Sequence, residues 1–376
     1  MALSFNASDE LTLRLKQTDL VAAKHSSLLE SLQPRDLEAM SRQVRISTIG
    51  ATTRIENAIL TDAQIDWIDT VLTRDGRPSS FAALRSQIED KLSKRHERSL
   101  EEVAGCREML TTIYSQGRDL FPLTLATLRG LHQQLLQYHA PAAYHLGRFK
   151  VVPNSVIQRN ALTGTEREVL KTSDPGPLTD AAMSDLLDWY NETLPHNPWP
   201  LAVASELVFR FLACHPFQDG NGRMGRVLFI LALLQSPEPH WNQLAPYLAV
   251  DRVIEQRRVE YYSVLAQTSG GRFDPDPHNY NLPLFIRFMS RVVDEALEAV
   301  NFYKDRAAAI FDLAPAPTTV LEYFRDLPEQ RLTAALLRQA TGLPGRTITR
   351  ALSTLLNAKL IQRYGRGPAT RYQLAF

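Results

Sequence analysis

Two strongly apolar segments, separated by a polar and flexible loop, constrain the fold of this chain more than any other feature. The first, LAVASELVFRFLAC (201–214), places apolar side chains at helical spacing, and the second, RMGRVLFILALLQS (223–236), is more apolar still. Segments of this kind are stable as helices buried against other helices. The stretch that joins them, HPFQDGNGRMGR (215–226), is therefore predicted to lead from one buried helix into the next.

Most other periodic segments are also predicted to be helical. Residues 145–172 differ, because β-branched residues alternate there with Gly, Pro and Asn, which predicts a hairpin or an extended flap. A Pro/Ala linker at 312–319 marks a domain boundary. We therefore expect a mainly α protein with a small β-hairpin, divided into a helical N-terminal region (1–118), a helical core (119–305) and a C-terminal domain (315–376).

Composition excludes several classes of protein and site. The chain has 42 Lys and Arg against 41 Asp and Glu, so its overall charge selects no partner. Two cysteines, Cys106 and Cys214, are too few for a disulfide framework or a zinc site, and their scarcity is typical of a reducing compartment. Because neither a signal peptide nor a membrane span is apparent, we expect a cytoplasmic protein without membrane contact.

The loop at 215–226 has the features of a site for phosphate groups. Gly220, Asn221 and Gly222 tolerate backbone conformations that can aim several N–H groups at one anion, at the positive end of the following helix. Arg223 and Arg226 lie three residues apart in the first turns of that helix. Two guanidinium groups beside such a cradle predict more than one phosphate group.

An acid and a base complete the predicted chemistry of the loop. A carboxylate would repel phosphates unless it binds a cation between them, so Asp219 is predicted to hold Mg²⁺. His215 can take a proton from an attacking hydroxyl. The combination predicts attack of a hydroxyl on a Mg²⁺-bound nucleotide phosphate. Each of these features alone is more often structural, and only their joint occurrence within twelve residues argues for function.

The stretch matches the signature His-x-Phe-x-Asp/Glu-Gly-Asn-Gly-Arg-x-x-Arg at every fixed position, so the chain resembles the Fic family. The resemblance implies a helical core and a nucleotidyltransferase that moves AMP from ATP to a Ser, Thr or Tyr hydroxyl of a target protein, and of itself. His215 would be the general base, Asp219 the Mg²⁺ ligand and 220–222 the phosphate cradle. Arg223 and Arg226 would hold the β- and γ-phosphates.

Two further segments resemble parts of the same family. GRFKVVPNSVI (147–157) is similar to the flap that pairs with the backbone of the target protein, and here we expect Ser155, Val156 and Ile157 at the nucleotide site. Tyr261 and Tyr262 resemble the tyrosines that line the adenine pocket, although core packing explains them equally well.

The stretch TTRIEN (52–57) resembles the family's inhibitory pattern Ser/Thr-x-x-x-Glu-Gly/Asn, with Thr52, Glu56 and Asn57 at the fixed positions. The resemblance implies that Glu56 pairs with Arg226 and leaves ATP poorly placed for reaction. A helix with one surface glutamate is the alternative. In some family members this glutamate instead helps to remove AMP from the target, so a de-AMPylase stays open.

The C-terminal segment is basic, with nine Lys and Arg against three Asp and Glu in Pro317–Phe376. Its pattern predicts three helices and a hairpin, which is the order of a winged helix. Basic and hydroxyl side chains begin the last of these helices or lie on the hairpin: Arg346, Thr347, Thr349, Arg350, Arg363, Arg366 and Arg371. DNA binding, dimerisation and target docking all stay open, as does a DNA-binding regulator whose nucleotide site is only a sensor. The intact His215 favours the enzyme.

Overall fold

The computed structural model describes residues 2–73, 81–89, 97–159, 164–327, 330–367 and 370–375. Within these ranges the protein is mainly α, as expected, with two antiparallel two-stranded sheets. It divides into a larger unit (Met1–Leu32, Ala51–Ala58 and Glu101–Val300) and a smaller unit (Gln33–Gly50, Ile59–Leu100 and Asn301–Phe376). Each unit combines segments that are far apart in the sequence.

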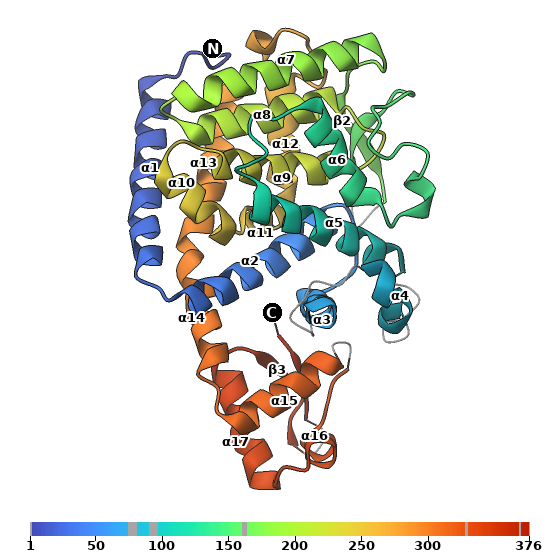
Figure 1. Cartoon of the computed structure of the whole chain (residues 1–376), viewed down its shortest axis with the longest axis vertical. Coiled ribbons are helices and arrows are strands. Elements are labelled where there is room, and N and C mark those ends of the chain that lie inside the picture. The colour runs from blue at the N-terminus through green and yellow to red at the C-terminus, as the bar shows by residue number, and fades with distance from the viewer. Residues whose placement is uncertain are drawn as a thin grey trace. The chain divides into compact units, whose positions relative to one another are not determined.

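Helices α8 (Pro200–Cys214) and α9 (Asn221–Leu234) lie at the centre of the larger unit and pack along each other (Figure 1). Nearly all of their side chains are buried, which confirms the predicted pair of buried helices. Their close approach requires Gly225, because a Cβ atom there would lie 2.9 Å from Cδ2 of Leu212.

The other helices of the larger unit surround this pair. Helices α7 (Pro177–Thr193) and α13 (Leu282–Glu298) pack against α8, and α1 (Asp9–Glu30) packs against α10 (Pro239–Leu244) and α13. A side-chain cap begins α6 (Leu125–Leu136), where the Thr124 hydroxyl accepts a hydrogen bond from the Thr127 N–H. The remaining elements are α5 (Glu97–Gln116), α11 (Val250–Gln256), α12 (Arg258–Ser269) and 3₁₀ turns at Ala140–Ala142, Leu194–His196, Ala245–Tyr247 and Pro277–Asn279.

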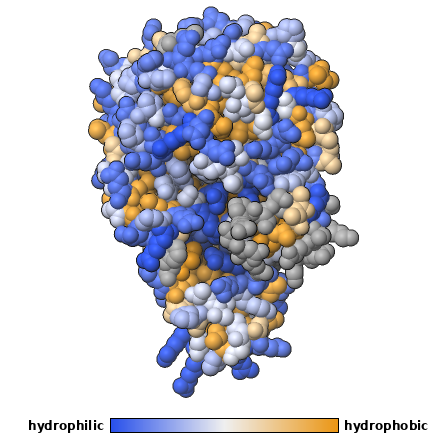
Figure 2. Space-filling view, in the orientation of Figure 1, coloured by the Kyte–Doolittle hydropathy of each residue, from blue (hydrophilic) through white to orange (hydrophobic). Residues whose placement is uncertain are grey.

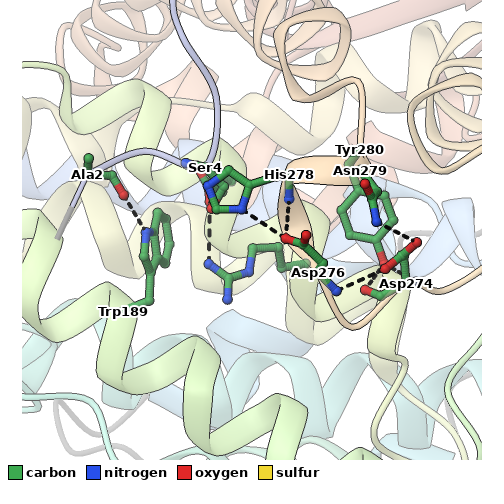
Figure 3. A network of polar contacts seen from close by, with 10 residues as sticks. Ala2, Ser4, Trp189, Asp274, Asp276, His278, Asn279 and Tyr280 are labelled. Atoms are coloured by element: carbon green, nitrogen blue, oxygen red, sulfur yellow. Dashed lines mark hydrogen bonds and ion pairs between the residues drawn. The ribbon is translucent and has the colours of Figure 1, made fainter.

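Polar contacts fix the residues that precede α1 (Figure 3). The indole N–H of Trp189 donates to the carbonyl of Ala2 at 2.9 Å, and both the N–H and the hydroxyl of Ser4 donate to the buried carboxylate of Glu206. Burial raises the pKa of Glu206, although Ser4 and Arg210 oppose the shift. The start of the chain is thereby attached to α7 and α8.

A small hairpin projects from the helical core. Strands β1 (Ser155–Arg159) and β2 (Glu166–Lys171) pair antiparallel, with Ser155 opposite Lys171 and a register shift between Val156 and Ile157. This confirms the hairpin that the sequence predicts within 145–172, although residues 160–163 of that stretch lie outside the described ranges.

The smaller unit contains the C-terminal segment, which has three helices followed by a hairpin. Apolar side chains of these elements form one core, including Val320, Leu337, Ile348, Leu355 and Leu374. No helix in the described ranges is long and apolar enough to cross a bilayer. The elements are most of α2 (Pro34–Ile55), α3 (Asp62–Thr73), α4 (Phe81–Glu89), α14 (Val300–Phe311), α15 (Pro315–Asp326), α16 (Ala334–Thr341), α17 (Gly345–Asn357), β3 (Ile361–Tyr364) and β4 (Arg371–Leu374).

Candidate functional site

The loop between α8 and α9 is held in a single shape by its own side chains. Helix α8 ends at Cys214 and is capped by His215, which has the left-handed φ of 54°, and α9 follows Gly220, which has φ of 80°. The Asn221 side chain bonds both the N–H and the carbonyl of Phe217, at 2.9 and 2.7 Å. Phe217 is fully buried, so the loop is anchored at its middle.

The hydrogen bonding and the burial of His215 favour its neutral form. Its Nδ1 lies 3.2 Å from the carbonyl of Leu212, which can only accept, so Nδ1 carries the proton and Nε2 keeps a lone pair. Burial lowers the pKa of His215 to about 4. The imidazole is therefore neutral near pH 7, in the form that can take up a proton.

The two loop glycines are needed for different reasons. Gly220 has the positive φ that favours glycine, as the sequence predicts. Gly222 has ordinary helical geometry, so conformational freedom is the wrong explanation for it. A Cβ atom at Gly222 would instead lie 2.3 Å from Oε1 of Glu56, so this glycine makes room for a carboxylate. Asn221 likewise begins α9 in a helical conformation and serves as a loop brace.

The Arg226 side chain is held by contacts with Thr52, Glu56 and Asp251. Its Nη2 donates to Oε1 of Glu56 at 2.8 Å and to the carbonyl of Thr52 at 3.0 Å, and its Nε donates to the Thr52 hydroxyl at 2.8 Å. Nε also lies 3.1 Å from Oδ1 of Asp251. Burial alone would lower the pKa of Arg226, but the two carboxylates outweigh it and raise the pKa. The contact of Glu56 with Arg226 is thus present in the structure.

Asp251 is a site residue that the sequence did not reveal. It lies in the first turn of α11, is almost fully buried, and forms a buried ion pair with Arg226. A single aspartate in a helix, 25 residues after its partner, has no local signature, and only the packing of α11 brings the two together.

Two further contacts hold the end of α2 in place. Arg54 forms a bidentate pair with Glu255 of α11, at 2.6 and 3.1 Å. Asn57 has a left-handed φ of 73°, and its side chain accepts a hydrogen bond from Arg258. The left-handed conformation explains why the pattern ends in Gly or Asn, the residues that adopt it most easily.

Asp219 and Arg223 differ in their surroundings. The Asp219 side chain is 47% exposed, and Arg223, among other groups, holds its pKa below the ordinary value although burial alone would raise it. Arg223 is buried, and its Nε and Nη1 have no hydrogen-bond partner in the described structure. Guanidinium donors without a partner are consistent with a site that binds an anion. Arg223 does not, however, line the pocket described next.

A pocket of about 280 Å³ brings together most of the other predicted site residues. Tyr261 and Tyr262 line it and are also well buried, so the structure does not separate an adenine contact from core packing for these tyrosines. Thr52 and Asn57 do not line it and act through Arg226 and the end of α2. The predicted residues on its wall are Glu56, Ser155, Val156, Ile157, His215, Asp219, Gly220, Asn221, Gly222, Arg226, Tyr261 and Tyr262, and those not predicted are Asn154, Leu170, Leu212, Gln218 and Leu265.

The base of the flap is tied to the loop. The Lys150 N–H donates to the carbonyl of Pro216 at 2.8 Å, and its Nζ donates to Asn154, Thr172 and the carbonyl of Cys214. The Asn154 side chain donates to the carbonyl of Phe217 at 2.7 Å. Lys150 therefore serves as an internal brace.

Part of the chain is similar to known proteins. Residues 122–233 match the model of the Fic/DOC family. A Fido domain-containing protein of Dictyostelium discoideum is 46% identical over 57 residues, covering 15% of this chain and 40% of that protein. The protein adenylyltransferase Fic of Nematostella vectensis is 24% identical over 60% of this chain and 46% of its own length.

The fold comparison covers more of the chain. The crystal structure of a Fic family protein from Desulfovibrio desulfuricans superposes with a TM-score of 0.56 at 24% identity, covering all of this chain and 98% of that one. The chain spans about half the length of the curated relatives that it matches. The matched domain, the shared fold and the loop at 215–226 together support a Fic/Fido family protein, and the family match itself covers residues 122–233.

Proposed function

We propose that this chain is a protein adenylyltransferase that transfers AMP from ATP to a hydroxyl group of a target protein and is restrained by Glu56. One observation carries the proposal: a histidine with a free Nε2 lone pair shares a pocket with a glycine cradle and a buried arginine. Relatives from Nematostella vectensis and Drosophila ananassae bear the name protein adenylyltransferase Fic, which supports it.

The proposed reaction uses the loop residues in named roles. Nε2 of His215 takes the proton of the target hydroxyl as its oxygen forms a bond to the α-phosphorus of ATP. The bond from the α-phosphorus to the bridging oxygen breaks, and pyrophosphate leaves. The N–H groups of 220–222, with Arg226 and Arg223, would stabilise the charge on the phosphates.

The residues present fit a magnesium ion. Among the residues that the structure describes, no group of three or more His, Cys, Asp or Glu side chains could hold a metal. Asp219 alone would supply a half-exposed carboxylate with a lowered pKa, and Mg²⁺ often binds through one carboxylate together with phosphate oxygens and water. Bound Mg²⁺ would neutralise charge on the phosphates.

Glu56 is proposed as an internal inhibitor. Its carboxylate lies against Gly222 and pairs with Arg226, so an anion already occupies part of the cradle. A γ-phosphate at Arg226 would have to displace it. The contacts Arg54–Glu255 and Thr52–Arg226 support this arrangement, because they hold the end of α2 against α11 and α9.

The target protein is proposed to dock along the flap. Val151, Val152 and Ile157 are exposed there, and β1 pairs on one side with β2. An extended target segment could add to the other edge of β1 and bring its hydroxyl toward His215.

Labelled ATP tests the proposed activity. Wild type, Glu56→Gly and the double variant Glu56→Gly/His215→Ala are incubated with α-labelled ATP and a cell lysate. We expect labelled protein with Glu56→Gly and none with the double variant, which should still bind ATP. Binding without any labelling would favour a nucleotide sensor, and wild-type loss of AMP from a labelled target would favour a de-AMPylase.

A second function, contact with duplex DNA, is proposed for the C-terminal segment. From Arg331 onward the sequence has eight Lys and Arg and no Asp or Glu, and all eight are exposed. Helix α17 buries Ile348, Leu352 and Leu355 and exposes Arg346 and Arg350. Hydrophilic residues project around α16 and α17 (Figure 2). This order of helices and hairpin fits a winged helix that places α17 in the major groove.

Salt dependence tests DNA contact. The affinity of the full chain for a 30-base-pair duplex should fall steeply with salt, and Arg346→Ala/Arg350→Ala should reduce the slope by about 2 if each arginine contacts one phosphate. Lys24→Ala, which removes an exposed charge from α1, is the control. Equal slopes for all three proteins would exclude this surface.

A further inference from the structure

His132, on α6, contacts both the catalytic loop and the flap. Its Nε2 lies 3.0 Å from the carbonyl of Asp219, and its Nδ1 accepts a hydrogen bond from the Gly147 N–H at 3.0 Å. Its ring is fully buried and stacks on Phe217, with 3.8 Å between the ring centroids and 5° between the planes. Both ring nitrogens therefore make hydrogen bonds, and one face of the ring makes a stacking contact.

These contacts select one form of the ring. The Gly147 N–H can only donate, so Nδ1 must carry a lone pair, and the neutral ring then has its proton on Nε2. That proton is donated to the Asp219 carbonyl, which can only accept. Burial, which lowers the pKa of His132 to about 4, agrees with a neutral ring. His132 thus joins two backbone segments that have no covalent link nearby.

The two joined segments carry different parts of the proposed reaction. Gly147, with φ of 63°, begins the flap along which the target would dock. The Asp219 carbonyl precedes the positive-φ turn at Gly220, where the phosphate cradle starts. Lys150 and Asn154 already tie the flap to Pro216 and Phe217, but Asp219 itself has its backbone held from α6.

We propose that His132 is a positioning residue. It fixes the backbone of Asp219 relative to the base of the flap, so that the target hydroxyl is held at a fixed position relative to the phosphates. The inference deepens the proposed transfer of AMP and rests on it for its catalytic consequence. The connection that His132 makes between the backbone of Asp219 and that of Gly147 does not depend on that function and can be measured separately.

Three variants separate positioning from simple filling of the core. His132→Phe keeps a ring on Phe217 but removes both hydrogen bonds. His132→Gln can place an amide N–H near Nε2 and retain the bond to Asp219. The control, His145→Phe, makes the same change in a buried histidine whose ring centroid is 6.3 Å away and whose Nδ1 has no hydrogen-bond partner in the described structure.

Amide hydrogen exchange of the intact chain tests the link without any activity. We expect exchange in 147–157 and 216–222 to become about 10-fold faster in His132→Phe and to be unchanged in His145→Phe. His132→Gln should keep 216–222 protected and lose protection at 147–157. Unchanged exchange in both segments of His132→Phe, with only a lower Tm, would overturn the proposal. If His132→Phe does not fold, His132→Gln alone tests the proposal. Faster exchange at 147–157 together with unchanged exchange at 216–222 would then support it, and any other result would overturn it.

Kinetics in the Glu56→Gly background give a second readout. Misplacement of the reacting groups should lower kcat about 10-fold or more in His132→Phe while KM for ATP changes less than about twofold. His132→Gln should recover most of the lost kcat. Equal losses in His132→Phe and His145→Phe would overturn the positioning role. If the Glu56→Gly protein itself transfers no AMP, the proposed function is rejected. The exchange experiment then decides whether His132 links the two backbone segments.

Discussion

Replacing Glu56 by glycine removes the carboxylate that lies in the candidate site without removing any other contact of Arg226. The Nη2 of Arg226 keeps its bond to the Thr52 carbonyl, and Asp251 still pairs with Nε. The Arg54–Glu255 pair still holds the end of α2. The change therefore tests one interaction, the 2.8 Å contact between Glu56 and Arg226.

The size of the effect follows from the burial of the two groups. Arg226 is 2% exposed and Glu56 is 31% exposed, so the contact is shielded on one side only. A hydrogen bond between charged groups contributes about 1.5–3 kcal/mol, and a value of about 2 kcal/mol suits this half-shielded pair. Since 1.4 kcal/mol corresponds to a factor of ten, we expect about a 30-fold rise in initial rate at ATP concentrations below KM.

The assay measures incorporation of α-labelled AMP into the protein itself over the linear phase. The matched control is Glu30→Gly, which removes an exposed glutamate from the end of α1, as Glu56 follows the end of α2. Binding of ATP and ADP is compared in parallel. If Glu56 competes with the γ-phosphate, Glu56→Gly should strengthen ATP binding more than ADP binding.

Two results would refute the reasoning. Equal rates in wild type and Glu56→Gly would show that the contact with Arg226 imposes no restraint. Equal gains in ATP and ADP affinity would show that Glu56 does not compete for the group that distinguishes them.

Three further predictions concern the base, the buried pair and the central helices. Because burial lowers the pKa of His215 to about 4, the base form persists in mild acid, so transfer by Glu56→Gly should hold its plateau down to about pH 5; a midpoint near 6.5 would contradict this. Asp251→Asn should cost about 1–3 kcal/mol of unfolding free energy, and more in the Glu56→Gly background, where Arg226 then has no carboxylate; equal costs in urea titrations would argue against a shared charge. Gly225→Ala should lower stability by about 1–3 kcal/mol, whereas Gly130→Ala, with no atom within 4 Å of the new methyl group, should raise it by about 0.5–1 kcal/mol; similar Tm shifts would exclude a close α8–α9 contact.

Local patterns predicted the central helices and the loop well. The apolar periodicity of α8 and α9 and the spacing within 215–226 both lie in short stretches of sequence, so no tertiary information was needed to place His215, Asp219 and Gly220 together. The contact between Glu56 and Arg226 spans 170 residues and was predictable only through a family resemblance.

Other parts of the site had no local signal. His132 and Asp251 are single polar residues within helices, and only packing brings them to Asp219 and Arg226. Gly222 was predicted for its conformational freedom, which is the wrong reason, because the carboxylate that lies against it comes from Glu56, far away in the sequence.

If a target protein docks along the flap as proposed, the flap limits which parts of that protein can be modified. Within the described residues β1 pairs only with β2, so the edge that a target would meet consists of backbone N–H and C=O groups. Such an edge distinguishes extended chain from helix, because a helix has already used these groups, but it does not distinguish one sequence from another. If the flap does receive the target, the modified hydroxyl must lie in a loop or an unfolded segment, and the choice of target must depend on surfaces other than the flap.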